Sequence, residues 1–331
     1  MKRVQFNHTS LEVTPIGLGL AALGRPGYIN LGHAADLKNE YDVAAMESHA
    51  HSVLDAAWES GIRYFDAARS YGLAEAFLSS WLRGRGIPTS EVVVGSKWGY
   101  TYTAGWQVEA EKHEIKDHSL AVFKRQIGES LHLLGDYLNI YQIHSATLDS
   151  GVLENWEVLE ALGELRDSGI IIGLSLSGPR QDETLRKAMS IDIGNKPLFA
   201  SVQATWNLLS REATSALSEA HQSGMGVIIK EALANGRLTA RNDEPEFALK
   251  RRLLDELAAN LGTTIDGLAL AAVLAQPWAD IVLSGAARTD HLHSNVKALE
   301  IIWTEELESQ VASLVEPADE YWATRSELEW N

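Results

Sequence analysis

Short apolar runs rich in β-branched residues alternate with amphipathic segments along most of this chain, and few folds accommodate such an alternation. Most of the runs are continuously apolar, which is typical of strands that are buried on both faces of a parallel sheet. We expect eight strands, at residues 13–20, 63–68, 91–97, 138–144, 170–177, 200–206, 226–232 and 281–286.

The segments between these strands have the pattern of helices. Five of them carry apolar residues three and four positions apart and end at a glycine, the residue preferred just after a helix. They span residues 44–61, 74–86, 120–135, 153–169 and 211–224. Repeated strand–helix units favour an α/β fold with a parallel sheet, and eight such units favour a closed (β/α)8 TIM barrel.

No proline- or serine-rich linker interrupts this pattern, so we expect one domain over residues 1–331. Residues 1–14 have the pattern of a β-hairpin that precedes the barrel. The length beyond a typical barrel lies in residues 22–45, in residues 98–118 and in a C-terminal tail, residues 317–331. We expect extended loops at the C-terminal face of the barrel.

The doubly wound dinucleotide-binding fold is the main alternative. Its fingerprint requires G-x-G-x-x-G opening directly into a helix. The glycines of GLGLAALG stand at Gly17, Gly19 and Gly24, which is a different spacing. Pro26 and Gly27 then oppose a helix at the point where a pyrophosphate would need one. We therefore rank this fold behind the barrel.

The charge and the cysteine count exclude several functions. The formal net charge of −17 repels phosphate backbones and anionic lipid, so we expect no nucleic-acid or membrane partner. The chain has no cysteine, which removes disulfides and thiolate chemistry. No apolar run has the length of a membrane span, and the first ten residues lack the apolar core of a signal peptide. We expect a cytoplasmic protein.

The histidines of KHEIKDHS, residues 112–119, superficially resemble those of a zinc helix. A zinc helix of the HExxH type needs its histidines four positions apart, whereas His113 and His118 are five apart. We therefore expect no metal site.

Four polar side chains stand where three consecutive strands are expected to end. Asp66 and Tyr71 follow the second strand, Lys97 ends the third and His144 ends the fourth. Each has a structural explanation by itself, as a helix cap, a packing phenol, a solvated strand end or a core histidine. Active sites of barrels lie at the carboxyl ends of the strands, so the coincidence favours catalysis.

These four residue types fit one kind of chemistry. A phenol is a poor proton donor at neutral pH, and a nearby ammonium lowers its pKa. A carboxylate keeps the ammonium charged, and an imidazole can orient a carbonyl group. The set predicts a general acid that protonates an oxygen while a hydride reaches the adjacent carbon. No side chain supplies a hydride, so a cofactor is required.

YFDAARSYG, residues 64–72, followed by Glu75, resembles the motif Phe-Asp-(Thr/Ser)-Ala-x-x-Tyr-Gly-x-(Ser/Ala)-Glu of the aldo-keto reductase superfamily. Ala67 replaces the usual hydroxyl residue, and the resemblance extends over nearly the whole chain. It implies that Tyr71 is the acid in reduction and the base in oxidation. It also implies that Lys97 and Asp66 tune Tyr71 and that His144 orients the carbonyl.

The resemblance further implies a nicotinamide cofactor. Ser175 and Gln203 match positions that bind the nicotinamide amide, and Lys230 replaces an aromatic residue that commonly stacks on the ring. The last segment is similar to the loop and helix that bind the adenosine phosphate, with fewer cations than usual, so NADPH is favoured and NADH stays an alternative. The implied cofactor contacts are Gly19, Ser175, Gln203, Lys230, Leu233, Gly285, Ala286, Arg288, His291 and Asn295. In that set, Gly285, Ala286 and Arg288 would line the 2′-phosphate and Asn295 the adenine.

Three aromatic residues follow Lys97 closely and suggest the wall of a substrate pocket: Trp98, Tyr100 and Trp106. Aromatic walls suit a hydrophobic or carbohydrate ring, although a loop that anchors itself by burying aromatics would show the same pattern. We expect a small carbonyl or alcohol substrate. The sequence leaves the oligomeric state open.

Two other functions fit parts of the pattern. A nicotinamide-binding regulatory subunit of the same fold would bind the cofactor with little turnover. A different barrel enzyme, such as a lyase or isomerase, would need no nicotinamide. The complete set of four polar residues favours the oxidoreductase.

Overall fold

A computed structural model describes residues 1–331 and contains a closed barrel of eight parallel strands, which confirms the predicted fold. Around the barrel the order is β12-β13-β14-β3-β4-β5-β8-β9, so strands that follow one another in sequence are neighbours in space. The strands are β3 (Ile16–Gly19), β4 (Tyr64–Asp66), β5 (Val93–Trp98), β8 (Leu138–Ala146), β9 (Ile171–Leu176), β12 (Ser201–Thr205), β13 (Gly226–Lys230) and β14 (Ile281–Ser284).

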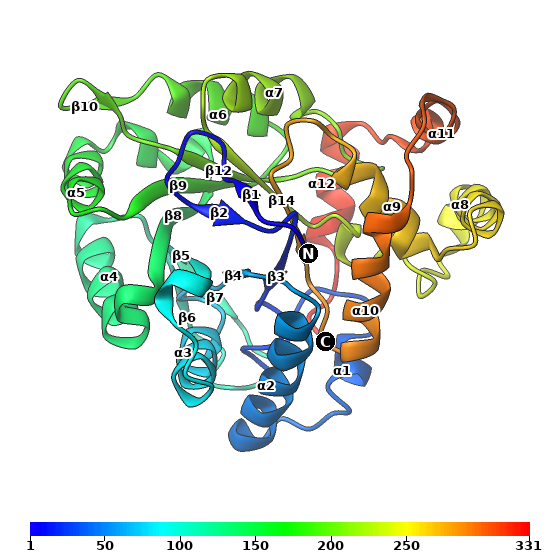
Figure 1. The fold of residues 1–331 in the computed structure, drawn as a ribbon, viewed down its shortest axis with the longest axis horizontal. Helices are drawn as coiled ribbons and strands as arrows, with labels where there is room; N and C mark the ends of the chain where they lie inside the picture. Colours follow the sequence, from blue (N-terminus) through cyan, green and yellow to red (C-terminus); the bar gives the residue numbers. More distant parts are fainter.

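Helices surround the barrel and connect its strands, and Figure 1 shows the barrel with this outer ring. Their apolar faces pack on the strands in a core of 63 buried residues. The ring consists of α2 (Val43–Glu59), α3 (Ala74–Gly84), α4 (Leu120–Leu134), α5 (Trp156–Asp167), α6 (Gln181–Met189), α7 (Thr214–Gln222), α9 (Ile265–Leu274) and α10 (Thr289–Lys297). The remaining helices are α1 (His33–Asp36), α8 (Ala248–Asn260), α11 (Glu305–Val311) and α12 (Ala318–Ser326).

The connections contain short ordered pieces. Eight 3₁₀ turns lie among them, at Thr89–Glu91, Gly135–Tyr137, Leu148–Ser150, Val152–Glu154, Ala234–Gly236, Pro245–Phe247, Ala298–Glu300 and Ala312–Leu314. A small antiparallel pair, β10 (Asp192–Ile193) with β11 (Lys196–Pro197), joins α6 to β12.

The predicted N-terminal hairpin closes one end of the barrel. Strands β1 (Val4–Gln5) and β2 (Glu12–Val13) pair antiparallel. Between them Phe6 is fully buried in a cluster with residues of β4, β5, β8, β13 and β14. A Cβ at Gly226 would overlap the Phe6 ring, so this glycine makes room for the hairpin. The hairpin therefore plugs the amino ends of the strands.

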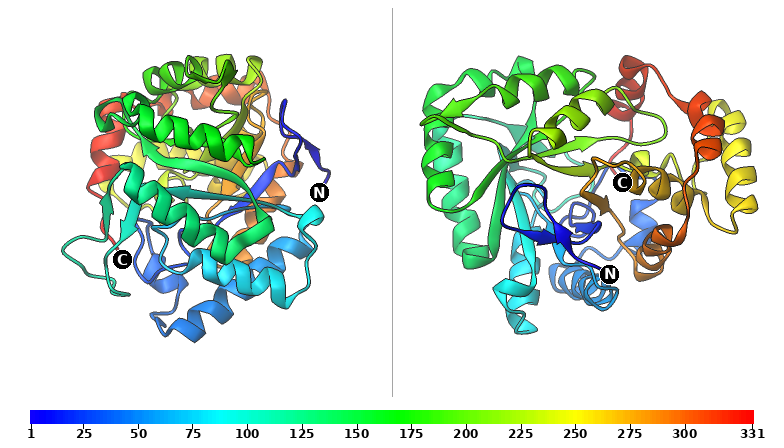
Figure 2. Two further views of the ribbon diagram at one scale, coloured as in Figure 1. Left: turned by 90° about the vertical axis from the view of Figure 1, so that its left-hand side faces the viewer. Right: turned by 45° about the horizontal axis from the view of Figure 1, so that its top comes forward.

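The longer connections gather at the opposite end of the barrel. Residues 98–118 form a second hairpin, β6 (Tyr100–Tyr102) with β7 (Glu114–Lys116), and α1 lies in the long connection after β3. The C-terminal tail forms α12, which packs with α8, α9 and α11 in a separate cluster of 17 buried residues. In the left view of Figure 2 the N-terminal hairpin and the C-terminus lie at opposite ends of the molecule.

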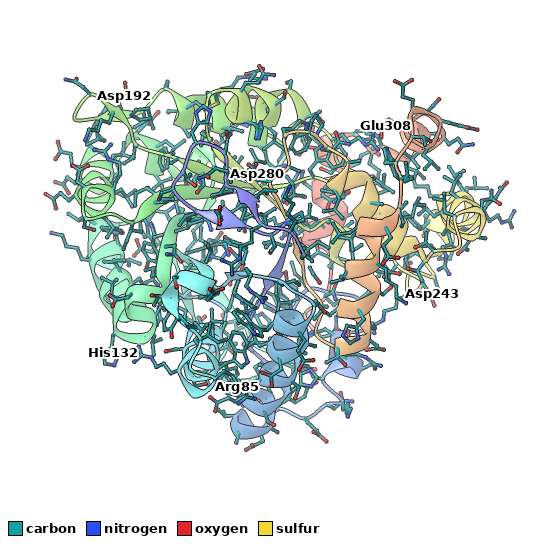
Figure 3. All side chains as sticks on the ribbon, viewed as in Figure 1. Arg85, His132, Asp192, Asp243, Asp280 and Glu308 are labelled. Atoms are coloured by element: carbon teal, nitrogen blue, oxygen red, sulfur yellow. The ribbon has the colours of Figure 1, made fainter.

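Charged side chains point outward from the outer helices and connections, as Arg85, Asp192 and Asp243 do in Figure 3. No single helix is long and apolar enough to cross a membrane. Only the bent pair Pro245–Asn260 and Ile265–Leu274 reaches that length and composition together, with an angle of 82° between its parts.

Candidate active site

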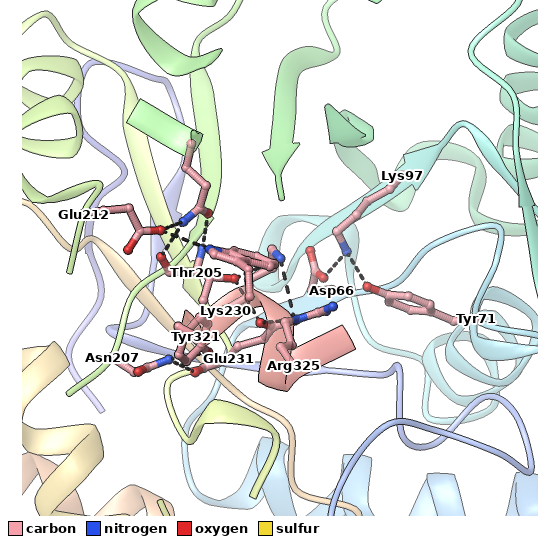
Figure 4. Close-up of polar contacts among 12 residues, drawn as sticks. Asp66, Tyr71, Lys97, Thr205, Asn207, Glu212, Lys230, Glu231, Tyr321 and Arg325 are labelled. Atoms are coloured by element: carbon pink, nitrogen blue, oxygen red, sulfur yellow. Dashed lines mark hydrogen bonds and ion pairs between the residues drawn. The ribbon is translucent and has the colours of Figure 1, made fainter. Parts of the chain in front are cut away.

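The structure brings the four polar residues together at the carboxyl ends of β4, β5 and β8. The Lys97 ammonium is fully buried, forms an ion pair with Asp66, and donates to the Ala67 carbonyl at 2.9 Å. Its Nζ lies 3.5 Å from the Tyr71 hydroxyl. Figure 4 shows Lys97 between the carboxylate and the phenol. The His144 ring meets the Tyr71 ring edge to face, with 5.5 Å between the centroids.

The Asp66 carboxylate is held by more than Lys97. Oδ1 accepts hydrogen bonds from the Gln203 amide at 2.9 Å and from the Tyr64 hydroxyl at 3.2 Å. Gly95, on the neighbouring strand, has no side chain, and a Cβ there would overlap the Tyr64 hydroxyl. A buried charge with several hydrogen bonds has a fixed position, so Asp66 fixes the lysine in turn.

The loop from Ala67 to Gly72 is built around a buried ion pair. The Arg69 amide donates to the Lys97 carbonyl at 3.0 Å, and its side chain pairs with Glu75. The Glu75 carboxylate also accepts from Ser96 at 2.5 Å and from Ser130 at 2.7 Å. This anchoring holds the backbone that carries Tyr71 against the end of β5.

A bulge at the end of β8 positions His144. The register of β8 against β9 shifts between Ile143 and Ala146, and Ser145 adopts a left-handed conformation with φ 51°. Bulges redirect side chains next to functional sites. Nδ1 of His144 lies 3.4 Å from the Ser70 hydroxyl. Burial and the nearby Lys97 lower the pKa of His144 well below its usual value, so the imidazole is neutral.

The pKa of Tyr71 differs from the expectation. We expected Lys97 to lower it, but burial and the Asp66 carboxylate raise it well above the usual value. Arg25 is the cation that acts in the opposite direction. The expected lowering fails because Asp66 already balances the charge of Lys97 and because the surrounding protein desolvates the phenol. Tyr71 is therefore fully protonated in this state.

A single large cavity of about 650 Å³ extends from this cluster toward β14 and α10. Its wall includes Asp66, Tyr71 and His144. Of the implied cofactor contacts, all but Ser175 and Arg288 lie on the wall, namely Gly19, Gln203, Lys230, Leu233, Gly285, Ala286, His291 and Asn295. The size and the mixed polar and apolar lining suit a cofactor together with a small substrate.

Two observations show that the residues present fit a nicotinamide dinucleotide. The Ser175 hydroxyl is buried without a hydrogen-bond partner, and the strand register pairs Ser175 with Gln203. An unpaired buried hydroxyl is costly unless a ligand satisfies it. At the other end of the cavity no atom lies within 4 Å of a Cβ built at Gly285, which leaves its backbone accessible.

Lys230 lies between the four clustered polar residues and the C-terminal tail. Its Nζ donates to Thr205 at 3.1 Å and lies 3.8 Å from the Glu231 carboxylate. Burial lowers the pKa of Lys230 to about 8, although Glu231 acts in the opposite direction. Burial would raise the pKa of Glu231, but Arg325 and Lys230 lower it to about 2. Figure 4 shows this network beside Asp66, Tyr71 and Lys97.

At the end of the cavity where the adenosine phosphate was expected to bind, the position of Arg288 differs from the expectation. Arg288 is half exposed, makes a two-point ion pair with Asp290 at 2.9 and 2.7 Å, and does not lie on the cavity wall. At this end of the cavity the arginine on the wall is Arg241, which pairs with the buried Asp36 and lies 3.5 Å from His291. Asn295 donates to Ser284 at 2.8 Å.

Two of the three aromatic residues expected in a substrate pocket lie elsewhere. Trp98 is fully buried and packs on Phe123 of α4, because successive side chains of a strand point to opposite faces and Lys97 points inward. Trp106 donates to the Tyr41 carbonyl at 2.6 Å and does not line the cavity. Tyr100 does line it, with its ring 5.1 Å from that of His144.

The cavity wall also carries charged and aromatic residues that the sequence did not indicate, among them Arg25, Glu231, Arg325 and Trp330. Arg25 and Glu231 follow strands β3 and β13, so the search beyond strand ends, which found Asp66, would have found them as well. Arg325 and Trp330 lie in the tail, and nothing in their spacing indicates that they reach the cavity. His113 stacks on Trp330 with 3.9 Å between the ring centroids, and β7 replaces the helix that a zinc motif would need.

Known proteins resemble this chain in both sequence and structure. A solved aldo-keto reductase, AKR11C1 from Bacillus halodurans in its holo form, matches with a TM-score of 0.73 and 26% identity, covering 96% of this chain and 97% of that one. The uncharacterized oxidoreductase YqkF of Bacillus subtilis is 24% identical over 90% of this chain and 91% of its own length.

An L-glyceraldehyde 3-phosphate reductase of Escherichia coli O157:H7 is 26% identical over 86% of this chain and 85% of its own length. The model of the Aldo/keto reductase family matches residues 15–316, which include every barrel strand and the four clustered polar residues. Sequence, fold and relatives agree, and the chain belongs to the aldo/keto reductase family of oxidoreductases.

Proposed function

We propose that this protein interconverts aldehydes or ketones and the corresponding alcohols with NADP(H), and that NADH is a weaker alternative cofactor. The observation that supports this most is the contact of Tyr71 with the buried Lys97–Asp66 pair on the wall of the large cavity. A bound nicotinamide dinucleotide would supply or accept the hydride that no side chain provides.

Tyr71 acts as the proton donor in reduction. Its phenol is protonated in the free protein, and Lys97 is placed to stabilise the phenolate that forms when the proton leaves. Asp66 holds Lys97 in place. In oxidation the same phenolate takes the proton back from an alcohol.

His144 orients the substrate oxygen. Because its imidazole is neutral, it donates one N–H and accepts at the other nitrogen. With Nδ1 accepting from Ser70, Nε2 is the nitrogen that donates to a carbonyl oxygen beside Tyr71.

Ser175 and Gln203 would hold the nicotinamide amide, and Lys230 would lie beside the ring. Gly285, Ala286, His291, Asn295 and Arg241 would hold the adenosine part. The two arginines nearest the proposed adenosine site, Arg241 and Arg288, are paired with carboxylates. A 2′-phosphate should therefore add less binding free energy than it would in a site with unpaired cations. We also propose that residues 1–331 act as one domain, and a cytoplasmic location stays a prediction.

Separate titrations with NADPH and NADH test the proposal, because tryptophan fluorescence reports binding. A panel of aldehydes and sugars is then assayed in both directions. Binding of neither dinucleotide would contradict the proposed function. Tight binding without turnover on any substrate would favour a regulatory role.

The Tyr71→Phe variant should lose turnover by roughly 10²- to 10⁴-fold, the usual contribution of a positioned acid. Cofactor affinity should remain, because the hydroxyl is not a proposed cofactor contact. Tyr41→Phe is the matched control, since the Tyr41 hydroxyl lies outside the cavity. Equal turnover in the Tyr71→Phe variant and the wild-type protein would remove Tyr71 as the acid.

A further inference from the structure

Arg25 lies beside the proposed proton donor and has no role in the chemistry described so far. It follows β3, is 3% exposed, and lines the cavity. The centre of its guanidinium group lies 5.3 Å from the centroid of the Tyr71 ring. The guanidinium group therefore lies beside the ring of Tyr71 on the same cavity wall.

Surrounding groups hold the guanidinium in one place. Nη1 donates to the Ser70 carbonyl and to the Glu114 carboxylate, both at 3.0 Å. Its centre also lies 4.7 Å from the Trp330 ring centroid and 5.4 Å from that of Tyr28. Three aromatic rings therefore surround the cation, which reduces the entropy that it would lose on binding a ligand.

One edge of the guanidinium remains without partners. Nε is buried and makes no hydrogen bond, and Nη2 has none within the chain either. Two adjacent N–H groups form the fork that binds a carboxylate or a phosphate through two parallel hydrogen bonds. Other buried ionic groups of this cavity have hydrogen-bond partners. Because buried polar groups are normally hydrogen-bonded, the unpaired edge of Arg25 indicates a site for a ligand.

The charges around Tyr71 also favour an anion. Near Tyr71, Asp66, Glu114 and Glu231 oppose the cations Arg25, Lys97, Lys230 and Arg325, an excess of one positive charge. The far part of the cavity wall instead carries Asp36, Asp266 and Asp290 against Arg241, so the excess is confined to the end beside Tyr71. Arg325 satisfies Glu231 with bonds of 2.5 to 3.0 Å, so Lys230 is the least fully paired cation. This excess stands inside a chain whose formal net charge is −17.

We propose that the substrate is an aldehyde or ketone that carries an oxyanion, a carboxylate or a phosphate, and that the free edge of Arg25 binds this group. The inference rests on the proposed function and adds the class of substrate to it. Arg25 is then a specificity-determining residue, and Lys230 adds positive charge on the same side. A neutral carbonyl compound would leave the Arg25 edge unpaired.

Matched substrate pairs measure this preference. Succinic semialdehyde is compared with butyraldehyde, and glyceraldehyde 3-phosphate with glyceraldehyde, so the two pairs separate a carboxylate from a phosphate. Wild-type protein should show a kcat/KM higher by roughly 10- to 100-fold for the anionic member of at least one pair, as expected for a charged two-point hydrogen bond.

Three variants assign the preference to Arg25. Arg25→Gln should remove it, and Arg25→Lys, which keeps the charge without the fork, should keep a part of it. Glu114→Gln should strengthen it, because it removes a negative charge beside the edge of Arg25 that would bind the anion. Arg85→Gln is the control, since Arg85 forms a comparable pair with Asp55 on the surface.

Calorimetric titration of succinate and of inorganic phosphate into NADPH-saturated protein gives a readout without turnover. Binding should weaken at least tenfold in Arg25→Gln, as loss of a charged hydrogen bond predicts. Equal kcat/KM within both pairs, or anion binding that is the same in Arg25→Gln, would overturn the inference. If NADPH does not bind, the proposed function fails, and titration into the free protein still decides the role of Arg25.

Discussion

Two opposing influences meet at the Tyr71 hydroxyl. Burial and Asp66 keep its proton bound, whereas Lys97 at 3.5 Å favours the phenolate that forms during reaction. In the proposed reaction, Tyr71 therefore keeps its proton until a substrate oxygen takes it. This balance depends on desolvation, which residue spacing does not reveal, and that is why the sequence led to a lowered pKa.

The identity of the four clustered residues was predictable because each stands at a strand end, and strand ends can be located from apolar runs. The direction of a side chain was less predictable. Trp98 follows Lys97 directly and therefore points to the helices, a consequence of strand geometry that the loop interpretation overlooked. Ser175 was identified by resemblance, and its missing hydrogen bond became visible only in three dimensions.

Replacing Ser175 by alanine separates ligand binding from stability. The free protein should keep its stability or gain slightly, because a buried unpaired hydroxyl is removed. NADPH affinity should fall by about 5- to 10-fold through the lost hydrogen bond. Thermal unfolding with and without NADPH measures both effects. A destabilised free protein with unchanged NADPH affinity would indicate a structural role instead.

Lys230 should make cofactor binding depend on pH. Its pKa is lowered from 10.5 to about 8, so between these values the unfolded chain binds more protons than the folded one, and this group's contribution to stability rises with pH. Below pH 8 the charged amine should disfavour the positively charged nicotinamide ring of NADP⁺ relative to the neutral ring of NADPH. The dissociation constant of NADP⁺ divided by that of NADPH should therefore fall several-fold as the pH rises through about 8. In the Lys230→Met variant this ratio should be smaller and should not change with pH in this range. A wild-type ratio that does not change with pH would contradict the proposed position of Lys230 beside the nicotinamide ring.

At the scale of elements, the tail is fastened to the barrel by charge. Arg325 of α12 binds Glu231 at the end of β13, and Glu231 adopts a left-handed conformation with φ 55°. Tyr321 of the same helix accepts from Asn207 at 3.0 Å. Helices such as α2 and α3 were predictable from their periodicity and terminal glycines. The docking of α12 was not, because it depends on residues about 90 positions apart.

Arg325→Met should destabilise the protein by roughly 3–5 kcal/mol, because the buried Glu231 would lose its hydrogen-bonded partner and keep only Lys230, 3.8 Å away, as a counter-charge. Hydrogen exchange of Ala318–Ser326 should rise at the same time. Urea unfolding and exchange mass spectrometry measure the two effects. The double variant Glu231→Gln/Arg325→Met should recover most of the loss. Arg85→Met, which breaks an exposed pair, should change little.

At the scale of the whole molecule, the two ends of the barrel have different tasks. The hairpin and Phe6 close the amino end, and the site lies at the carboxyl end. The barrel itself was predictable, since eight apolar runs with helices between them have few solutions. The cavity was not, because three separate segments, 22–45, 98–118 and the tail, build its walls together with the strand ends.

Phe6→Ala should cost about 3–5 kcal/mol of stability, as expected for removing a fully buried aromatic ring. The kcat and KM should stay at wild-type values under conditions where the protein remains folded, because Phe6 lies at the end remote from the site. Urea unfolding and steady-state assays at low temperature check this separation. A lowered kcat in folded protein would show that the hairpin influences the site.

The cations of the cavity lie inside a strongly acidic surface, and this arrangement affects how ligands arrive. The net charge of −17 should repel an anionic ligand at long range, and the cations beside Tyr71 should attract it only at short range. Salt screens the long-range repulsion more than the buried contacts, since the Debye length is about 10 Å at 0.1 M. Association should therefore become faster as ionic strength rises toward the physiological range, the reverse of enzymes that steer their substrates by opposite charge.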